Sequence, residues 1–518
     1  MTGKRSQTIG LDDTKSVGFC LLSGVLMFAA FPPSQFGTLA FVCLGPWLWA
    51  VQGCRSVRAA CFASACFGGS FGLCATAWLR LACNPPAQEW GPYWWAWPLL
   101  SAIIAACYSL GGGLLWWLVH RGGLGFCFAT PLGVVCAESL LDGTARWFGS
   151  TTADVVRLGL TQADIPVIRA IAQLAGLAGV SAWVAMVNGC LVDVFARRCV
   201  RAETAWHHSK RMPLTAGILV LGAAWWALGS ERHGRFISVG ILPGSFDRYD
   251  DRLSRLAAQR PQLCVWPELA CSVHMTTGDQ EMLTHVARLV DSPILVGATR
   301  VEGQPLRVFN SMICVAPNGQ RIGTYDKQWL GPCEETWLPI TAMWSTDRHS
   351  SHEQFSAGNA CQRLTMPDNT TVCVGICHDV CFTEWSRQAA RESSDFLVVG
   401  ADEQIDPSGR LSHLMLALTQ FRAVESHRSI VRVSRPSLSG VIDFRGTFVS
   451  QSSGELGTSV VEVPITSVPS IRWSWGPCVF WLAMLFPCGW QLFRRINCGY
   501  ERTPTDPITY QRLLTRST

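Results

Sequence analysis

The sequence contains few charged residues and little tyrosine. Only 15 % of its 518 residues are Asp, Glu, Lys or Arg, whereas soluble domains carry about 25 %. The formal net charge of +5 is modest, and no basic helix carries interleaved aromatic residues, which argues against a nucleic-acid partner. The sequence also has no zinc-ligand spacing and no glycine-rich phosphate loop, so that no metal and no cofactor are expected.

The sequence is instead rich in apolar residues. Hydrophobic residues make up 49 %, and 23 Trp and 24 Phe stand against 6 Tyr, which is typical of a protein with apolar spans and interfacial anchors. The 23 cysteines are scattered, and many lie in apolar runs where they are interpreted as small buried side chains. Their spacing shows no disulfide framework. At this length we expect two or three domains.

Apolar stretches close to the roughly 20 residues that a spanning helix needs recur along the first 230 residues. The predicted spans are residues 16–32, 36–53, 58–79, 94–119, 123–141, 170–195 and 213–229, followed by an eighth at 473–493. The third is rich in small residues, which favours close helix packing in lipid. The first has basic residues before it like a signal peptide, but the spans behind it and the missing cleavage site favour an uncleaved anchor.

Loop charges predict the orientation of these spans. If the N-terminus is cytoplasmic, the basic residues of the cytoplasmic segments are Lys4, Arg5, Lys15, Arg55, Arg58, Arg121, Arg197, Arg198, Arg201, Lys210, Arg211, Arg494, Arg495, Arg502, Arg512 and Arg516. The opposite short loops clearly hold only Arg146 and Arg157. The positive-inside rule therefore predicts a membrane domain at 1–230 with seven transmembrane helices, a domain at 231–472 on the far side, an eighth helix at 473–493 and a cytoplasmic tail at 494–518. In a bacterium the far side of the inner membrane is the periplasm.

The region 231–472 has normal polarity and a different pattern. Short β-rich runs such as FISVGIL, TVCVGIC and DFLVVGA alternate with polar helical stretches. Strands that alternate with helices predict an α/β domain with buried sheet.

Three polar residues stand at or just beyond strand-like runs of this domain, namely Glu268, Lys327 and Cys377. Such positions are where α/β folds place reacting groups. A carboxylate can accept a thiol proton, and a lysine ammonium can lower the thiol pKa and stabilise an oxyanion. The three form a chemically sufficient set for nucleophilic catalysis, although sequence spacing alone does not bring them together. Taken singly, each has a plainer interpretation as a surface charge or a buried thiol.

The runs VWPELA, FNSMICVAPNGQRIGTYDKQWLGPCEETWLP and VGICHDVCFTE resemble the three catalytic motifs of the nitrilase superfamily, and most of all its apolipoprotein N-acyltransferase branch. By motif, Glu268 matches the general base, Lys327 the catalytic lysine and Cys377 the nucleophile. Glu335 matches a second glutamate near the active site. The runs FRAVESHRSIVRVSRPSLSGVIDFRG and RWFGSTTADVVRLGLTQADIPVIRAIAQLAGLAGVSAWVAMVN resemble further segments of the family, so that the resemblance covers essentially the whole chain.

The resemblance implies a multi-span α-helical membrane domain joined to an α-β-β-α nitrilase-like domain in the bacterial inner membrane, with the catalytic domain periplasmic. It implies transfer of a fatty acyl chain from a phospholipid donor to the N-terminal amine of a diacylglyceryl-cysteine apolipoprotein, through a cysteine thioester. Two alternatives stay open. The first is a membrane-anchored carbon–nitrogen hydrolase that uses the same triad, and the second is a lipoprotein-binding module without catalysis.

The sequence departs from the family pattern beside the nucleophile. His378 and Asp379 replace a Tyr-Glu pair, and both are expected to support the site or bind substrate together with Glu335. Three loops also differ, at residues 153–156, 401–405 and 434–437, and an aromatic residue of the family is missing from the second. The differences lie in loops that would contact substrate and leave the three catalytic positions unchanged. Cys373, four residues before Cys377, is assigned to the core.

Overall fold

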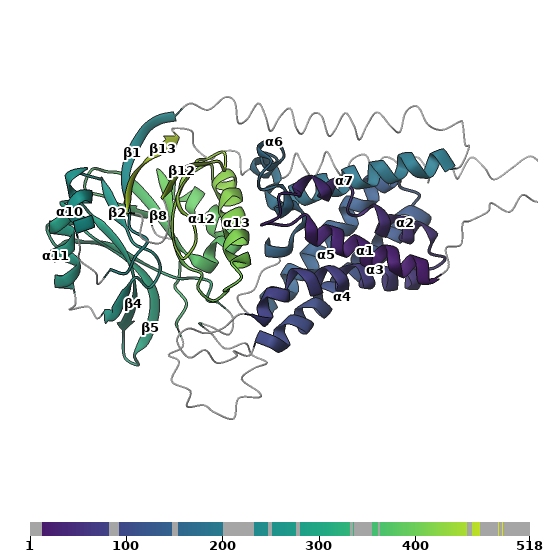
Figure 1. Cartoon of the computed structure of the whole chain (residues 1–518), viewed down its shortest axis with the longest axis horizontal. Helices are drawn as coiled ribbons and strands as arrows, with labels where there is room; N and C mark the ends of the chain where they lie inside the picture. The colour runs from purple at the N-terminus through teal and green to yellow at the C-terminus, as the bar shows by residue number, and fades with distance from the viewer. Residues whose placement is uncertain are drawn as a thin grey trace, which may run out of the picture.

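The computed structural model of the chain has a helical part and an α/β part, which lie side by side (Figure 1). The structure describes residues 13–81, 93–147, 154–199, 233–246, 251–275, 280–331, 335, 355–360, 363–452, 458–466, 485 and 489. The helical part comprises residues 13–199 and the α/β part residues 233–466.

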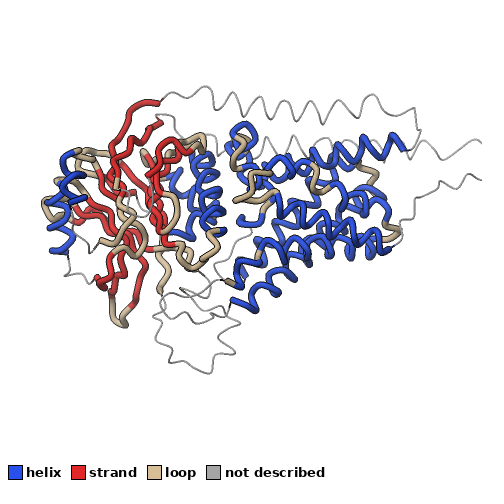
Figure 2. The backbone as a smooth tube through the Cα atoms, viewed as in Figure 1, coloured by secondary structure: helices blue, strands red, loops and turns tan. Residues whose placement is uncertain are grey.

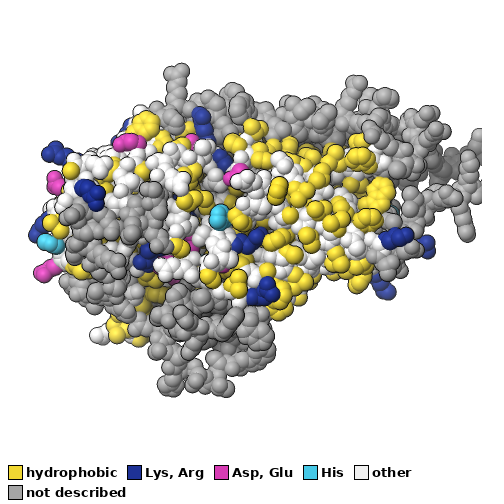
Figure 3. Space-filling model, viewed as in Figure 1, with side chains coloured by type: hydrophobic (Ala, Val, Ile, Leu, Met, Phe, Trp, Pro, Cys, Tyr) yellow, Lys and Arg dark blue, Asp and Glu magenta, His cyan; other side chains and the backbone are white. Residues whose placement is uncertain are grey.

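The first part is built of helices, drawn blue in Figure 2. They are α1 (Asp13–Ala29), η1 (Gly37–Phe41), α2 (Gly45–Gly53), α3 (Val57–Ala75), η2 (Ala77–Arg80), α4 (Tyr93–His120), α5 (Phe126–Trp147), η3 (Asp154–Val156), η4 (Leu158–Gln162), α6 (Pro166–Arg169) and α7 (Ala172–Cys199). Within the described residues, four helices are long and apolar enough to cross a membrane, namely α3, α4, α5 and α7. Their outer faces expose large apolar side chains such as Phe62 and Leu110, and hydrophobic side chains spread over the helical part in Figure 3. Lipid is the medium that such a surface requires.

The stretch 36–53, predicted as one span, does not form a continuous helix. It contains the 3-10 turn η1 and then α2, which is nine residues long. Pro46 lies in the first turn of α2, the position at which a residue without an N–H does not break a helix. The predicted spans at 213–229 and 473–493 lie outside the described residues, so the count of eight and the domain boundaries stay predictions.

Small residues of α3 pack directly against α4, as the third predicted span suggested. A Cβ added at Gly72 would lie 2.9 Å from the Cα of Ser101, closer than real Cβ atoms come. At Gly68 it would lie 2.8 Å from the Cβ of Tyr108. The two backbones therefore approach as closely as glycine permits.

Two sheets make up the α/β part. The first has the order β13-β1-β2-β4-β5-β6, with β3 paired to β4, and the second the order β12-β11-β10-β9-β8-β7. Their strands are β1 (His233–Ile241), β2 (Leu263–Val265), β3 (Cys271–Met275), β4 (Ile294–Glu302), β5 (Arg307–Val315), β6 (Arg321–Asp326), β7 (Arg363–Thr365), β8 (Thr371–Ile376), β9 (Phe396–Asp402), β10 (Ile430–Arg435), β11 (Ser439–Ile442), β12 (Phe448–Ser452) and β13 (Ser459–Thr466). The helices are α10 (Asp251–Ala258), α11 (Gln280–Val290), η5 (Cys377–Cys381), α12 (Thr383–Arg391) and α13 (Arg410–Ser426).

Alternating side chains assign each face of the sheets to a layer. On β8, Val374 and Ile376 enter the core between the two sheets, whereas Cys373 faces the helices that cover the second sheet. Helices α10 and α11 cover the outer face of the first sheet. The expected α-β-β-α sandwich is confirmed.

Helix α13 joins the two parts of the molecule. It lies between the second sheet and the membrane helices, on the side of the α/β part that faces the bundle (Figure 1). Residues on nearly all of its sides are buried, and its apolar side chains belong to the same core cluster as those of the bundle. A helix buried all round needs partners on every side, and α13 finds them in both domains.

Candidate active site

The three predicted catalytic residues come from the ends of strands in both sheets. Glu268 follows β2 and Lys327 follows β6 in the first sheet, while Cys377 follows β8 in the second. The bend that carries Glu268 lies against β4, where Gly297 has no side chain. A Cβ at Gly297 would lie 2.2 Å from the carbonyl oxygen of Pro267. Sheet packing therefore brings together residues that are far apart in the sequence.

Lys327 lies between two carboxylates. Its Nζ is 2.8 Å from Oε1 of Glu268 and 2.8 Å from Oε2 of Glu335. Asn310 of β5 donates from Nδ2 to both glutamates, at 2.7 Å to Glu268 and 2.6 Å to Glu335. The Gly331 N–H donates to Glu335 at 2.6 Å. All three charged groups are buried, so each depends on these partners in place of water.

The environment separates the pKa values of the two glutamates. Burial raises the pKa of Glu268, and the negative charge of Glu335 adds to this against the opposing effect of Lys327. Burial also acts on Glu335, but Lys327 and the donors Gly331 and Asn310 outweigh it and hold its pKa below the ordinary value. Burial would lower the pKa of Lys327, yet the two carboxylates raise it well above the ordinary value. Glu335 is thus kept ionised, Lys327 protonated, and Glu268 is the carboxylate suited to exchange a proton.

Cys377 is the first residue of η5 and has a left-handed backbone conformation, with φ of 43°. Its Sγ lies 3.8 Å from the carbonyl oxygen of Asp402, at the end of β9. The N–H of the same Asp402 donates to Oε2 of Glu268 at 2.8 Å. One residue's backbone therefore contacts both the thiol and the carboxylate. A non-glycine residue with positive φ at a strand-to-helix turn presents its side chain away from the sheet and stores backbone strain.

Asp379 anchors the turn that begins with Cys377. Its Oδ2 accepts hydrogen bonds from the Tyr325 hydroxyl at 2.7 Å and the Ile376 N–H at 2.8 Å, and its Oδ1 accepts one from the Trp329 N–H at 3.1 Å. Burial raises the pKa of Asp379 to about 6, although these hydrogen bonds oppose the shift. The side chain thus ties η5 to the segment that follows Lys327.

His378 lies in an aromatic group beside the turn. Its ring meets Phe382 edge to face, with centroids 5.4 Å apart, and Phe382 stacks on Trp329 at 5.0 Å. His378 is half-buried.

Comparison with known proteins agrees with both halves of this description. The Apolipoprotein N-acyltransferase N-terminal domain family matches residues 23–190, and the Carbon-nitrogen hydrolase family matches residues 243–472. The Apolipoprotein N-acyltransferase of Allorhizobium ampelinum is 25 % identical over 512 residues, covering 89 % of this chain and 92 % of the relative. That of Geobacter metallireducens is 26 % identical over 457 residues, covering 82 % and 85 %.

The chain belongs to the apolipoprotein N-acyltransferase family. It is a membrane acyltransferase with a carbon–nitrogen hydrolase domain. Among solved structures, a carbon-nitrogen hydrolase of Helicobacter pylori is similar at 13 % identity and a TM-score of 0.36, covering 47 % of this chain and 95 % of that one. A nitrilase-superfamily protein of Saccharomyces cerevisiae has 19 % identity and a TM-score of 0.33, covering 47 % and 94 %.

Several residues around the predicted triad of this acyltransferase escaped the sequence analysis. Asn310 is a polar residue shortly before the apolar end of β5, which was the available signal for it. Arg435 donates from Nη2 to the Glu268 carbonyl oxygen at 3.2 Å and pairs with the Asp402 carboxylate at 2.6 Å, which fixes the bend beneath Glu268. Asp402 acts on Glu268 through its backbone, and a backbone contact has no sequence signature.

Proposed function

We propose that this acyltransferase moves a fatty acyl group from a phospholipid to the N-terminal amine of the diacylglyceryl-cysteine of apolipoproteins, through a thioester on Cys377. The observation that carries the proposal is the buried cluster in which Lys327 contacts Glu268 and Glu335, with Glu268 linked to Cys377 through Asp402. This cluster supplies a base, a cation and a nucleophile at one place.

In the first half-reaction, Glu268 accepts the proton of the Cys377 thiol, and the sulfur attacks the carbonyl carbon of a phospholipid acyl ester. The Lys327 ammonium and a backbone N–H near residue 378 stabilise the oxyanion of the tetrahedral adduct. When the adduct collapses, the ester C–O bond breaks and Glu268 returns the proton to the leaving oxygen. A lysophospholipid departs and the acyl group stays on sulfur.

In the second half-reaction, the neutral α-amine of the acceptor attacks the thioester carbonyl. A C–N bond forms, the C–S bond breaks, and Glu268 transfers the proton that nitrogen loses to the departing thiolate. Glu335, whose pKa is held low, remains ionised throughout and orients Lys327. The cycle uses neither a metal nor a cofactor.

The membrane domain explains why a nitrilase-like site acts on lipids. Both substrates are held at a bilayer surface, and a site anchored there meets them at high effective concentration. Exclusion of water also protects the thioester from hydrolysis. The charge bias of the loops supports an inner-membrane location with the catalytic domain in the periplasm.

Labelling of the full-length protein in detergent micelles tests the proposal. A phospholipid labelled in its acyl chain is expected to label Cys377, and a diacylglyceryl-cysteine peptide is expected to remove the label as an amide. Cys377→Ala is expected to take up no label. Cys373→Ala is the matched control, because Cys373 lies in the core on β8, the strand that precedes Cys377, and it is expected to retain labelling.

The alternatives give different outcomes. Rapid release of labelled fatty acid into water, without amide formation, would identify a hydrolase. If Cys377→Ala restores lipoprotein N-acylation to a bacterial strain without this activity as well as the wild type does, Cys377 is not the nucleophile.

A further inference from the structure

The turn that carries Cys377 is held at its far end by one arginine. Arg422 of α13 donates from Nε to the carbonyl oxygen of Val380 at 2.8 Å and from Nη2 to that of Cys381 at 3.0 Å. These are the last two residues of η5, which begins at Cys377. Arg422 is fully buried.

Arg422 is itself held by carboxylates from two domains. Glu425, one turn further along α13, accepts from Nη1 at 2.6 Å. Asp154, from the turn η3 between the spanning helices α5 and α7, forms an ion pair with Nη2. The hydroxyl of Thr383 bridges the two, because it accepts from Nη1 of Arg422 at 3.0 Å and donates to Asp154 at 3.2 Å. All five N–H groups of the guanidinium therefore have acceptors, which a lysine with three donors cannot reproduce.

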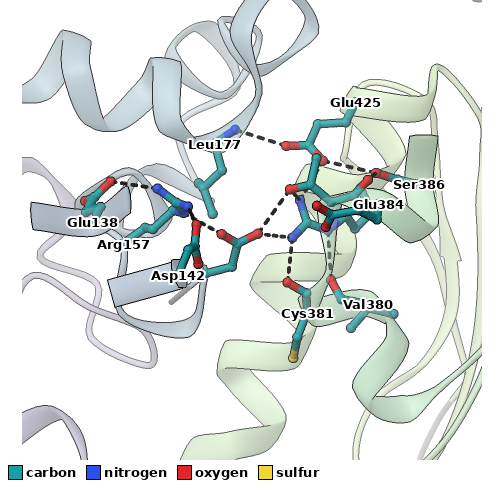
Figure 4. Close-up of polar contacts among 12 residues, drawn as sticks. Glu138, Asp142, Arg157, Leu177, Val380, Cys381, Glu384, Ser386 and Glu425 are labelled. Carbon is teal, nitrogen blue, oxygen red and sulfur yellow. Dashed lines mark hydrogen bonds and ion pairs between the residues drawn. The ribbon is translucent and has the colours of Figure 1, made fainter. Parts of the chain in front are cut away.

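Arg157, Glu138 and Asp142 form a larger polar network of the membrane domain (Figure 4), which Asp154 joins through its ion pair with Arg157. Arg157 forms ion pairs with Asp154 and with Asp142 of α5, and its Nη1 lies 3.2 Å from Oε2 of Glu138, also on α5. The position of Asp154 is thereby fixed relative to a spanning helix.

A second membrane helix contacts the same cluster through Glu425. The helical path of α7 is interrupted at Gly176, with φ of 64°, and the N–H of Leu177 beyond it donates to Oε1 of Glu425 at 3.0 Å. A carboxylate is favoured where a new helical segment begins, since its first N–H groups have no partners within the helix. Both α5 and α7 are thus connected to the nucleophile turn through Arg422 and its partners.

We propose that Arg422 is a positioning residue for Cys377, and that Asp154 makes the geometry of the nucleophile turn depend on docking of the membrane domain. Cys377 has a strained φ, which persists only where neighbouring contacts hold it. Asp379 fixes the middle of η5, and Arg422 fixes its end. The inference rests on the nucleophilic role proposed above for Cys377.

The test uses Asp154→Asn in the full-length protein in detergent micelles. The expected result is a loss of at least tenfold in kcat for thioester formation with little change in KM. The rate at which iodoacetamide alkylates Cys377 is measured over a range of pH by mass spectrometry of the Cys377 peptide. In Asp154→Asn, either this rate or the apparent pKa of the thiol is expected to differ from the wild type. Alkylation reports on the turn even if the acyl-transfer reaction proves to be different, which separates failure of this inference from failure of the proposed function.

Arg169→Lys is the matched control. Arg169 is also buried and joins the domains, because it donates to the carbonyl oxygens of Arg445 and Ala163, but its hydrogen bonds to the described residues do not reach η5. Arg169→Lys is expected to lose about as much thermal stability as Asp154→Asn, but to keep kcat within twofold of the wild type. Equal losses of kcat in Asp154→Asn and Arg169→Lys, or an unchanged kcat and alkylation profile in Asp154→Asn, would overturn the inference. If Asp154→Asn does not fold, Thr383→Ala removes only the bridging hydroxyl and is expected to show the same effects in weaker form, while unchanged kcat and alkylation in it would count against the inference.

Discussion

Replacement of Lys327 by methionine tests the charge arrangement of the site most directly. The substitution leaves Glu268 and Glu335 buried around Asn310 without the cation that lies 2.8 Å from each. A pair of unit charges at that separation attracts by about 6 kcal/mol at an effective dielectric constant of about 20. Desolvation opposes this attraction, and removal of one member of a buried pair costs about 3–5 kcal/mol of folding free energy.

The cost in Lys327→Met is expected to depend on pH. Two neighbouring buried carboxylates retain a proton, whereas a glutamate in the unfolded chain binds one only below about pH 4.3. Between about pH 5 and 7 the folded variant therefore binds about one more proton than the unfolded chain. Its own stability therefore falls by about 1.4 kcal/mol for each unit of rising pH. The fall is steeper than in the wild type, where the Lys327 charge opposes proton binding by Glu268.

Thermal unfolding in detergent at several pH values measures this difference. The gap in Tm between Lys327→Met and the wild type is expected to widen from pH 5.5 to 7.5, and thioester formation is expected to be lost throughout. Arg300→Met is the control, because Arg300 also pairs with two carboxylates but one of them, Glu302, is exposed. A gap that stays constant or narrows as pH rises would refute the charge assignment.

Three further predictions concern single contacts. Asn310→Ala removes the donor shared by the two glutamates and is expected to lower kcat for thioester formation about 10–100-fold. The reason is that a buried acceptor left without its hydrogen bond costs about 1–3 kcal/mol. An unchanged kcat would show that the amide is dispensable. Burial raises the pKa of Asp379 to about 6, so ionisation of this group weakens the fold as pH rises from about 4 to 6, by up to about 3 kcal/mol. Asp379→Asn does not titrate there, so the Tm of the wild type is expected to fall relative to that of the variant over this range. A constant difference in Tm would contradict the raised pKa. Gly72→Ala is expected to lower Tm by separating α3 from α4, at about 1–3 kcal/mol, whereas Gly69→Ala, whose Cβ meets its nearest neighbour at 3.7 Å, should be tolerated.

Much of the fold could be predicted from the pattern of residues. Short apolar runs such as β8, in alternation with polar helical stretches, predicted an α/β domain with buried sheet, and the resemblance to the nitrilase superfamily implied the sandwich. Long apolar runs predicted α3, α4, α5 and α7. The stretch 36–53 was interpreted wrongly as one helix because hydropathy records apolar content and not the break before Pro46.

The sequence by itself determined which chemical groups the site contains, because Glu268, Lys327 and Cys377 stand within recognisable motifs at the ends of strands. The tertiary structure decided how those groups act on one another. Only the order of strands in the first sheet brings Glu335 and Asn310 to the same charge cluster, and only the packing of the second sheet against it brings in Cys377. Only the docking of α13 on the bundle connects Arg422 with Asp154. The physical reason is that a buried charge takes its pKa and position from partners that are distant in sequence, several of which are backbone groups that any residue carries.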